Sequence, residues 1–174
     1  MKSIKKQIIK VFTVALICSH FAASKALAFD PEISQAFASF IEIMHASVQT
    51  TNKGSMICIY GNDDISLRFK SRTKLVAFLD ADITSKKNHY SNCRIIYVAK
   101  DNEKFIKSFI GIFNHSGALT VATFDSFTND GGMVFIDLGR RDFELTLNTQ
   151  AFKGSGAKLD SSITALIINI KSRQ

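Results

Sequence analysis

The sequence of 174 residues lacks the clusters that most often mark a catalytic or metal site. It has three cysteines but no Cys-x-x-Cys pair, so a thioredoxin-type redox centre is not indicated. None of its four histidines belongs to a cluster with ligand spacing, which leaves a metal site unsupported. Repeats, linkers and a Gly-x-Ser-x-Gly elbow are also missing. We therefore expect one domain that is not an enzyme, with no catalytic residue, metal or cofactor.

Residues 1–28 predict a cleaved signal peptide. Four lysines precede an apolar run at residues 11–23, and Ala26-Leu27-Ala28 has the small-x-small pattern of a cleavage site. We place cleavage between Ala28 and Phe29. The apolar run is shorter than the roughly 20 residues that span a bilayer, and no later run is long enough. The mature chain, residues 29–174, is expected to be exported without membrane insertion, most simply to a bacterial periplasm.

The basic charge of the chain comes mostly from this signal segment. The whole sequence has 22 Lys and Arg against 15 Asp and Glu, a net charge of +7. Five of the lysines and none of the acids lie in residues 1–28, which leaves 17 bases against 15 acids. Net charge therefore gives no support to nucleic-acid binding. The remaining residues suffice for one domain with a substantial core.

Two cysteines, Cys58 and Cys93, remain after cleavage. An even number in an exported chain favours a disulfide, with two buried free thiols as the alternative. They are 35 residues apart, so a bridge would stabilise the fold by about 3–4 kcal/mol through loop entropy.

Strands and helices are predicted to alternate along the mature chain. Asp30-Pro31-Glu32 is typical of a helix start, and an apolar stripe continues that helix to about residue 46. Further strands are expected at 56–60, 76–79, 94–99 and 118–124, and further helices at 66–72, from Asp101 or Asn102 to about 113, and from Asp160 through Ile163, Leu166, Ile167 and Ile170. The segment 76–79 also fits a helix, and 149–158 fits either a short helix or a loop.

Residues 131–148 predict a β-hairpin. Phe143, Leu145 and Leu147 alternate with polar residues, as in a strand with one buried face. The preceding run Met133–Ile136 is apolar on both faces, which is typical of a more interior strand. Gly139, with the two arginines that follow it, would form the turn.

Two parts of this hairpin are candidates for docking a partner. The entrance, Gly131, Gly132 and Met133, either is set by backbone geometry or forms an edge where another protein docks. The turn residues Arg140 and Arg141 either are solvated or contact an acidic partner.

The order of elements predicts an α/β fold, a three-layer α/β/α sandwich of the flavodoxin-like kind. Strand–helix alternation up to residue 124 implies parallel strands, and the hairpin adds antiparallel strands at one edge of a mixed sheet. A doubly wound order would make the strands at 56–60 and 94–99 neighbours. Cys58 and Cys93 would then lie close enough to be bridged.

The other polar candidates have structural interpretations. His45, His89 and His115 are each expected at the surface or in a loop. Asp63-Asp64 could bind a cation, but a helix cap is the better interpretation.

The mature chain resembles the YfiR family of periplasmic regulators over nearly its whole length. The resembling pieces are Ile57-Cys58-Ile59-Tyr60-Gly61, Cys93 to Val98, Leu119-Thr120-Val121 leading to Phe127, Gly131-Gly132-Met133-Val134, Phe143-Glu144-Leu145 with Asn148, Gly156 to Leu159, and Ser161-Ser162. The chain departs from the family where a Trp-Pro pair usually ends the first helix, because it has Ile43-Met44-His45 there. It also has Asp63-Asp64-Ile65-Ser66 in place of the common Asp-Pro-Phe-Gly.

The resemblance implies a non-enzymatic regulatory role. Such proteins bind the periplasmic sensor domain of an inner-membrane diguanylate cyclase and repress it, which lowers cyclic di-GMP and affects biofilm formation. Members are often dimeric, and Cys58 and Cys93 match the family's bridging cysteines. The alternative is a periplasmic small-ligand receptor, with a crevice near Gly61, Lys100 and Phe124-Asp125 at the carboxyl ends of the strands.

Overall fold

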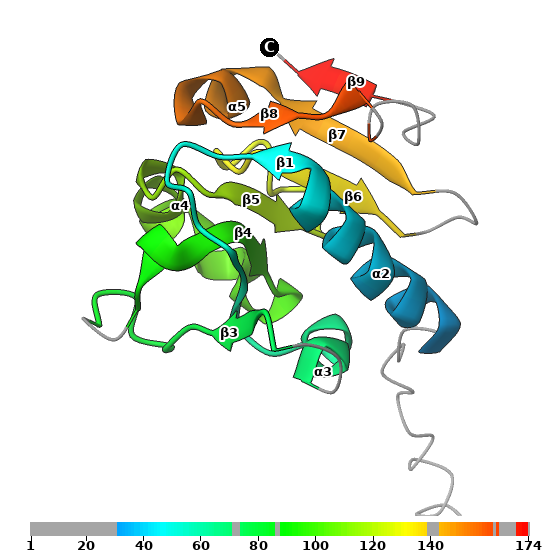
Figure 1. Cartoon of the computed structure of the whole chain (residues 1–174). Coiled ribbons are helices and arrows are strands. Elements are labelled where there is room, and N and C mark those ends of the chain that lie inside the picture. Colours follow the sequence, from blue (N-terminus) through cyan, green and yellow to red (C-terminus); the bar gives the residue numbers. More distant parts are fainter. Residues whose placement is uncertain are drawn as a thin grey trace, which may run out of the picture.

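The computed structural model describes residues 31–70, 74–85, 88–138, 143–161, 163 and 170–173 (Figure 1). The predicted signal peptide, with its cleavage site at Ala28 and Phe29, lies outside these residues. The turn residues Arg140 and Arg141 lie outside them too. Among the described residues, no helix has both the length and the apolar character needed to cross a membrane.

The main sheet has seven strands. Their bounds are β2 Met56–Tyr60, β3 Val76–Phe78, β4 Cys93–Val98, β5 Leu119–Ala122, β6 Val134–Asp137, β7 Glu144–Asn148 and β9 Ile170–Arg173. The strand order is β3-β2-β4-β5-β6-β7-β9. All neighbouring pairs are parallel except β6 and β7, which are antiparallel. The predicted mixed α/β sheet and its antiparallel pair are confirmed, as is the neighbouring position of the two cysteine-bearing strands.

Helices cover both faces of this sheet (Figure 1). The helical segments are α2 Pro31–Ser47, α3 Asp64–Lys70, η1 Tyr90–Asn92, η2 Lys100–Phe105, α4 Ile106–His115 and α5 Thr149–Ser155. The apolar stripe of α2 packs on one face in a core that includes Phe37, Ile41 and Met44. The apolar side of α4 packs on the other face in a second core that includes Phe109 and Phe113.

The central strands divide their side chains between these two cores. In β2, Ile57 and Ile59 belong to the α2 core, whereas Cys58 and Tyr60 belong to the α4 core. This alternation follows from the two-residue period of a strand. Because both faces are covered, β2, β4 and β5 have no polar face, as expected for strands inside a parallel sheet.

The C-terminal segment differs from its prediction at its end, although Ser161 and Ile163 are helical as predicted. Ile163, Leu166, Ile167 and Ile170 have helical spacing, but Ile170 begins strand β9, which pairs in parallel with β7. The hairpin is therefore not the outermost part of the sheet, because β9 lies beyond it. Residues 164–169 lie outside the described part of the chain. A run of apolar residues fits a buried strand as well as a helix, and the local spacing could not decide between them.

Two smaller features were also not predicted. Val48–Gln49 (β1) and Lys158–Leu159 (β8) form an antiparallel ribbon apart from the main sheet. Residues 100–105 form a 3-10 segment before α4, so Asp101 lies in its first turn and does not cap an α-helix.

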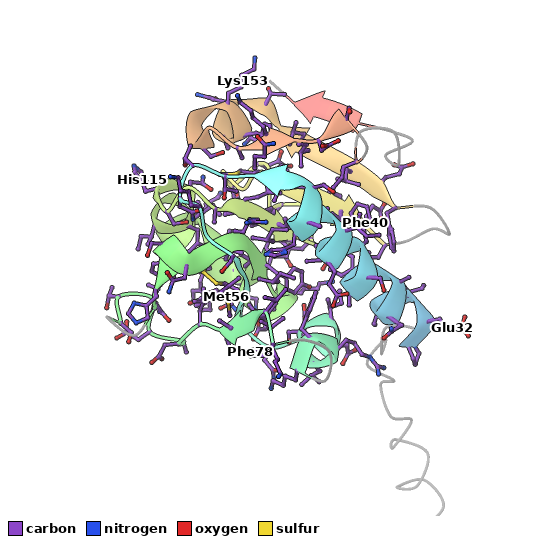
Figure 2. All side chains as sticks on the ribbon, in the orientation of Figure 1. Glu32, Phe40, Met56, Phe78, His115 and Lys153 are labelled. Atoms are coloured by element: carbon purple, nitrogen blue, oxygen red, sulfur yellow. A yellow bond between two sulfur atoms is a disulfide. The ribbon has the colours of Figure 1, made fainter. Side chains whose placement is uncertain are left out.

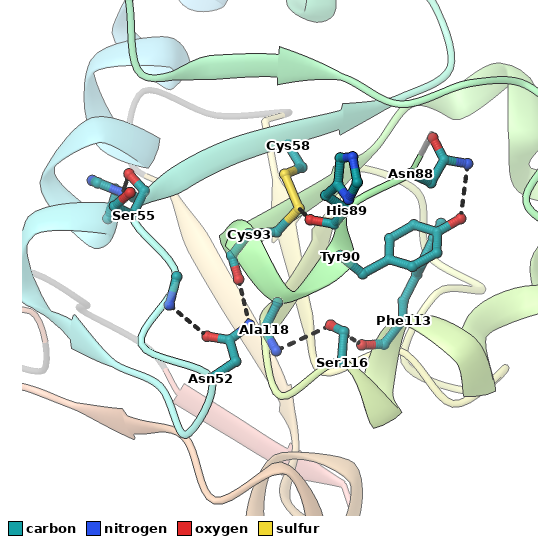
Figure 3. The surroundings of a disulfide bond; sticks show 12 residues. Asn52, Ser55, Cys58, Asn88, His89, Tyr90, Cys93, Phe113, Ser116 and Ala118 are labelled. Carbon is teal, nitrogen blue, oxygen red and sulfur yellow. Dashed lines mark hydrogen bonds between the residues drawn. A yellow bond between two sulfur atoms is a disulfide. The ribbon is translucent and has the colours of Figure 1, made fainter. Parts of the chain in front are cut away.

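Cys58 and Cys93 form the predicted disulfide between β2 and β4 (Figure 3). Their Cα atoms are 5.6 Å apart, within the range that a disulfide requires. Cys58 is 1% exposed and Cys93 is 0% exposed, so the bridge lies inside the α4 core. The carbonyl of Cys93 also accepts a hydrogen bond from Asn52 Nδ2 at 2.6 Å. The bridge thus joins the two central strands from within.

We expect replacement of both cysteines by alanine to lower the free energy of unfolding by about 3–4 kcal/mol, because the unfolded chain regains the freedom of the bridged loop. Urea unfolding of the mature protein with and without the two substitutions measures this difference. A thiol assay on the unreduced, unfolded mature protein should detect no free thiol. Detection of two thiols would contradict the bridge.

Candidate functional site

The docking candidate Gly131, Gly132 and Met133 forms the entrance to β6. Gly131 has φ +102°, a conformation that glycine adopts at little cost. A Cβ on Gly132 would collide with the ring of Phe127, which is fully buried. Met133 is 0% exposed and belongs to the α2 core. The structure therefore gives these residues a packing role, and it places the Met133 side chain where a partner does not reach it.

A chain of hydrogen bonds holds this entrance in place. The Met133 N–H donates to Thr120 Oγ1 at 3.1 Å, and the Thr120 hydroxyl donates to Asn114 Oδ1 at 3.2 Å. Asn114 Nδ2 in turn donates to the carbonyl of Gly131 at 2.8 Å. Thr120 is fully buried. Its hydroxyl therefore both donates and accepts a hydrogen bond within the protein, as a polar group that water cannot reach requires. One asparagine at the end of α4 thereby fixes both ends of the Gly131–Met133 segment.

At the carboxyl ends of the strands, Asp63 is the central polar residue. Its Oδ2 accepts hydrogen bonds from the Tyr97 hydroxyl at 2.8 Å and from the Lys100 N–H at 3.1 Å. Its Oδ1 accepts from the Ser66 N–H at 2.8 Å, which caps α3 as predicted. Burial raises the pKa of Tyr97 well above its usual value, and the Asp63 charge adds to this shift. Tyr97 therefore remains a protonated donor, and the Asp63 carboxylate is occupied by internal partners.

The neighbouring residues Gly61 and Asn62 also contact the segment that follows β4. The Asn62 N–H donates to Asp101 Oδ2 at 3.1 Å, and a Cβ on Gly61 would collide with the side chains of Asp101 and Asn102. Around Gly61, where a crevice for a small ligand was expected, the segment that follows β4 thus packs closely against the chain.

An open groove of about 620 Å³ lies instead at the opposite edge, near the start of β5. Its walls come from the loop at Thr51, the end of α4 and the end of α5. Two bases line it, His115 and Lys153. His115 Nδ1 lies 2.5 Å from the carbonyl of Gly111, so that nitrogen donates and Nε2 is the nitrogen that a ligand could reach. The groove has no signal in the sequence because its walls come from three separate segments.

Of the three histidines expected at the surface, His45 is buried. It is 8% exposed, near the end of α2, and its Nε2 lies 2.9 Å from the carbonyl of Ser55. Burial lowers the pKa of His45, and the charge of Arg94 lowers it further, against the opposing effect of the Ser55 hydrogen bond. His45 is thus a neutral anchor of α2. His89 and His115 are exposed as predicted.

No three His, Cys, Asp or Glu side chains within the described part of the chain come together in a way that could hold a metal ion. The groove is therefore a candidate surface, whereas the polar network beneath the Gly131–Met133 segment is internal. The turn containing Arg140 and Arg141 remains a docking prediction outside the described residues.

We expect Gly132→Ala to lower the free energy of unfolding by about 1–3 kcal/mol, because its Cβ must displace the buried Phe127 ring. Gly111→Ala is the matched control, since a Cβ there meets nothing within 4 Å on α4. It should be neutral or stabilise by up to about 1 kcal/mol through helix propensity. Urea denaturation of both variants tests the difference, and equal effects would contradict the packing role of Gly132.

Comparison with known proteins identifies the fold and the family. No curated protein matches the chain in sequence. The solved structures that resemble it include a conserved domain protein from Vibrio cholerae O1 biovar El Tor strain N16961, with a TM-score of 0.56 and 14% sequence identity. That match covers 83% of this chain and 61% of the other, and it shows a shared fold. A model of the YfiR/HmsC-like family matches residues 32–166, which include both cysteines, the Gly131–Met133 entrance and the groove. The chain belongs to the YfiR/HmsC-like family.

Proposed function

We propose that this protein is a periplasmic regulator that binds the sensor domain of an inner-membrane diguanylate cyclase and represses it. Repression would lower cyclic di-GMP and thereby affect biofilm formation. The observation that carries the proposal is membership of the YfiR/HmsC-like family over residues 32–166. The predicted signal peptide and the buried disulfide support a periplasmic location, because disulfides persist in oxidising compartments.

A binding role also agrees with the chemistry of the described residues. The half-buried acid Asp63 and the buried histidine His45 each have internal partners, so neither is poised to act on a substrate. A repressor needs no such group. It needs only to bind an inactive conformation of its partner more tightly than the active conformation. The difference between these two affinities sets the degree of repression.

The docking proposal centres on the hairpin. Arg140 and Arg141 supply two adjacent positive charges in its turn, which suit an acidic surface on the cyclase. The Gly131–Met133 entrance would contribute by fixing the position of the hairpin, since Met133 itself is buried.

We expect deletion of the gene to raise cyclic di-GMP in cells that contain the cognate cyclase, and a plasmid copy to restore the low level. Reversing two charges in Arg140→Glu/Arg141→Glu should weaken repression, because repulsion replaces attraction at the turn. Lys100→Glu/Lys104→Glu is the matched control, with the same charge change on an exposed segment elsewhere. Cyclic di-GMP measured by mass spectrometry is the readout.

Unchanged cyclic di-GMP after deletion, with the cyclase present, would reject repression. Equal loss of repression in both charge variants would reject docking at the turn and leave the repressor role standing. Immunoblots of periplasmic extracts establish that each variant accumulates to the same level.

The second candidate function is a small-ligand receptor, which the groove favours. Lys153 gives the groove a positive charge that suits a small carboxylate or phosphate, and His115 adds a ring nitrogen that can form a hydrogen bond. Lys153 lies in the last turn of α5, so its charge also interacts favourably with the negative end of that helix. A bound anion would compete with this helix end for the lysine, so we expect modest affinity.

We expect inorganic phosphate to raise the melting temperature of the mature protein above that in chloride at equal ionic strength. The effect should be lost in Lys153→Glu, because the substitution places a negative charge in the groove. Lys104→Glu, on η2, should keep it. Differential scanning fluorimetry measures the shift, and equal melting temperatures in phosphate and chloride would argue against an anion site.

A further inference from the structure

The edge strand β3 presents apolar side chains to solvent. β3 is the first strand in the order β3-β2-β4-β5-β6-β7-β9, so it has a described neighbour on one side only. Leu75 is 47% exposed and Phe78 is 43% exposed. Figure 2 labels Phe78 beside β3 at the margin of the molecule. An exposed apolar edge of this kind is a template for pairing with another strand.

The pairing with β2 determines which backbone groups of β3 face outward. The Ile57 N–H donates to the Leu75 carbonyl at 2.8 Å, and the Leu79 N–H donates to the Ile59 carbonyl at 2.8 Å. Along a parallel strand the residues alternate between facing one neighbour and facing the other. Residue 77 therefore faces β2 together with 75 and 79. The N–H and carbonyl groups of residues 76 and 78 face away from the sheet.

The sequence around this strand is self-complementary. Residues 74–80 have a lysine at one end and an aspartate at the other, each three positions from Ala77. Two copies of the segment can run antiparallel about a two-fold axis at Ala77. The pairs across the axis are then Lys74 with Asp80, Leu75 with Leu79, and Val76 with Phe78. Every pair joins opposite charges or two apolar side chains, which are the favourable cross-strand combinations.

We propose that this edge is a homodimer surface, in which β3 pairs antiparallel with β3 of a second copy about a two-fold axis at Ala77. In this register Val76 of each copy forms a hydrogen-bonded pair with Phe78 of the other. The backbone groups of these two residues are the ones that face outward. Ala77 meets its own copy in the non-hydrogen-bonded position, which agrees with its backbone facing β2. A shift of one residue would lose both the charge match and the match of backbone groups.

The side chains at this edge suit the same arrangement. Lys74 and Asp80 are both exposed, so their charges are available at the two ends of the strand. Asp80 Oδ1 accepts the Asp82 N–H at 3.2 Å, which leaves Oδ2 for the facing lysine. Lys70 Nζ lies over the Phe78 ring, 5.2 Å from its centre, which is a favourable contact for the exposed ring. This surface is separate from the hairpin, so failure of the dimer would leave the repressor proposal intact.

The experiment is a charge-swap series on the mature protein, with sedimentation velocity over a range of concentrations. Wild type should dimerise reversibly. Lys74→Glu and Asp80→Lys should each weaken the dimer about tenfold, because each turns two attractive pairs into repulsive ones. An equimolar mixture of the two variants should dimerise like wild type, since both cross pairs again join opposite charges. Lys104→Glu, away from the edge, should have no effect.

A second measurement does not depend on any variant. Hydrogen exchange of wild type should show protection of the amides of residues 76 and 78 that increases with protein concentration. A monomer at all concentrations would overturn the proposal. A dimer that is indifferent to the charge series, with no concentration-dependent protection at residues 76 and 78, would also overturn it and place the interface elsewhere.

Discussion

The parallel pairing of β2 with β4 is the contact on which the rest of the structure depends. Both strands are buried on both faces, and their register shifts between Met56 and Ile57, because Met56 pairs with Cys93 and Ile57 with Ile95. Arg94 is the extra residue in this irregularity, and such a bulge redirects a side chain. Arg94 Nε donates to the Gly54 carbonyl at 2.8 Å and Nη1 to the His45 carbonyl at 3.2 Å. The bulge thus ties the end of α2 to the centre of the sheet.

The burial of the disulfide bears on how redox state could influence the protein. With Cys58 and Cys93 almost inaccessible, a reductant has access mainly when the strands or the overlying α4 core open. Reduction would therefore follow local unfolding. Loss of the bridge would affect activity mainly through stability, because the disulfide lies beneath the surface and does not form part of it.

The sequence predicted the fold well where local pattern and tertiary environment agree. The α2 stripe and the alternation in β7 each have one dominant period, the apolar runs at β2 and β4 are short, and all four have the predicted structure. Ile170 was assigned to a helix because a run of Ile and Leu fits both the helical period of 3.6 residues and the strand period of two. Only its pairing with β7 shows that it belongs to a strand. The groove was missed for a different reason. It depends on Thr51 lying against Gly117 and Gly156, which are far apart in the sequence.

The groove and the hairpin entrance share one residue, Asn114. Asn114 lines the groove, and its side-chain amide accepts from Thr120 and donates to the Gly131 carbonyl. A ligand that hydrogen-bonds to this amide must compete with those partners, and the loss of either bond frees the segment that leads into β6. Since Thr120 is fully buried, its hydroxyl would lose an acceptor that water does not readily replace. A ligand bound to this amide would therefore be linked to the position of the hairpin through the energy of these two hydrogen bonds, so the two proposed functions are compatible in one molecule.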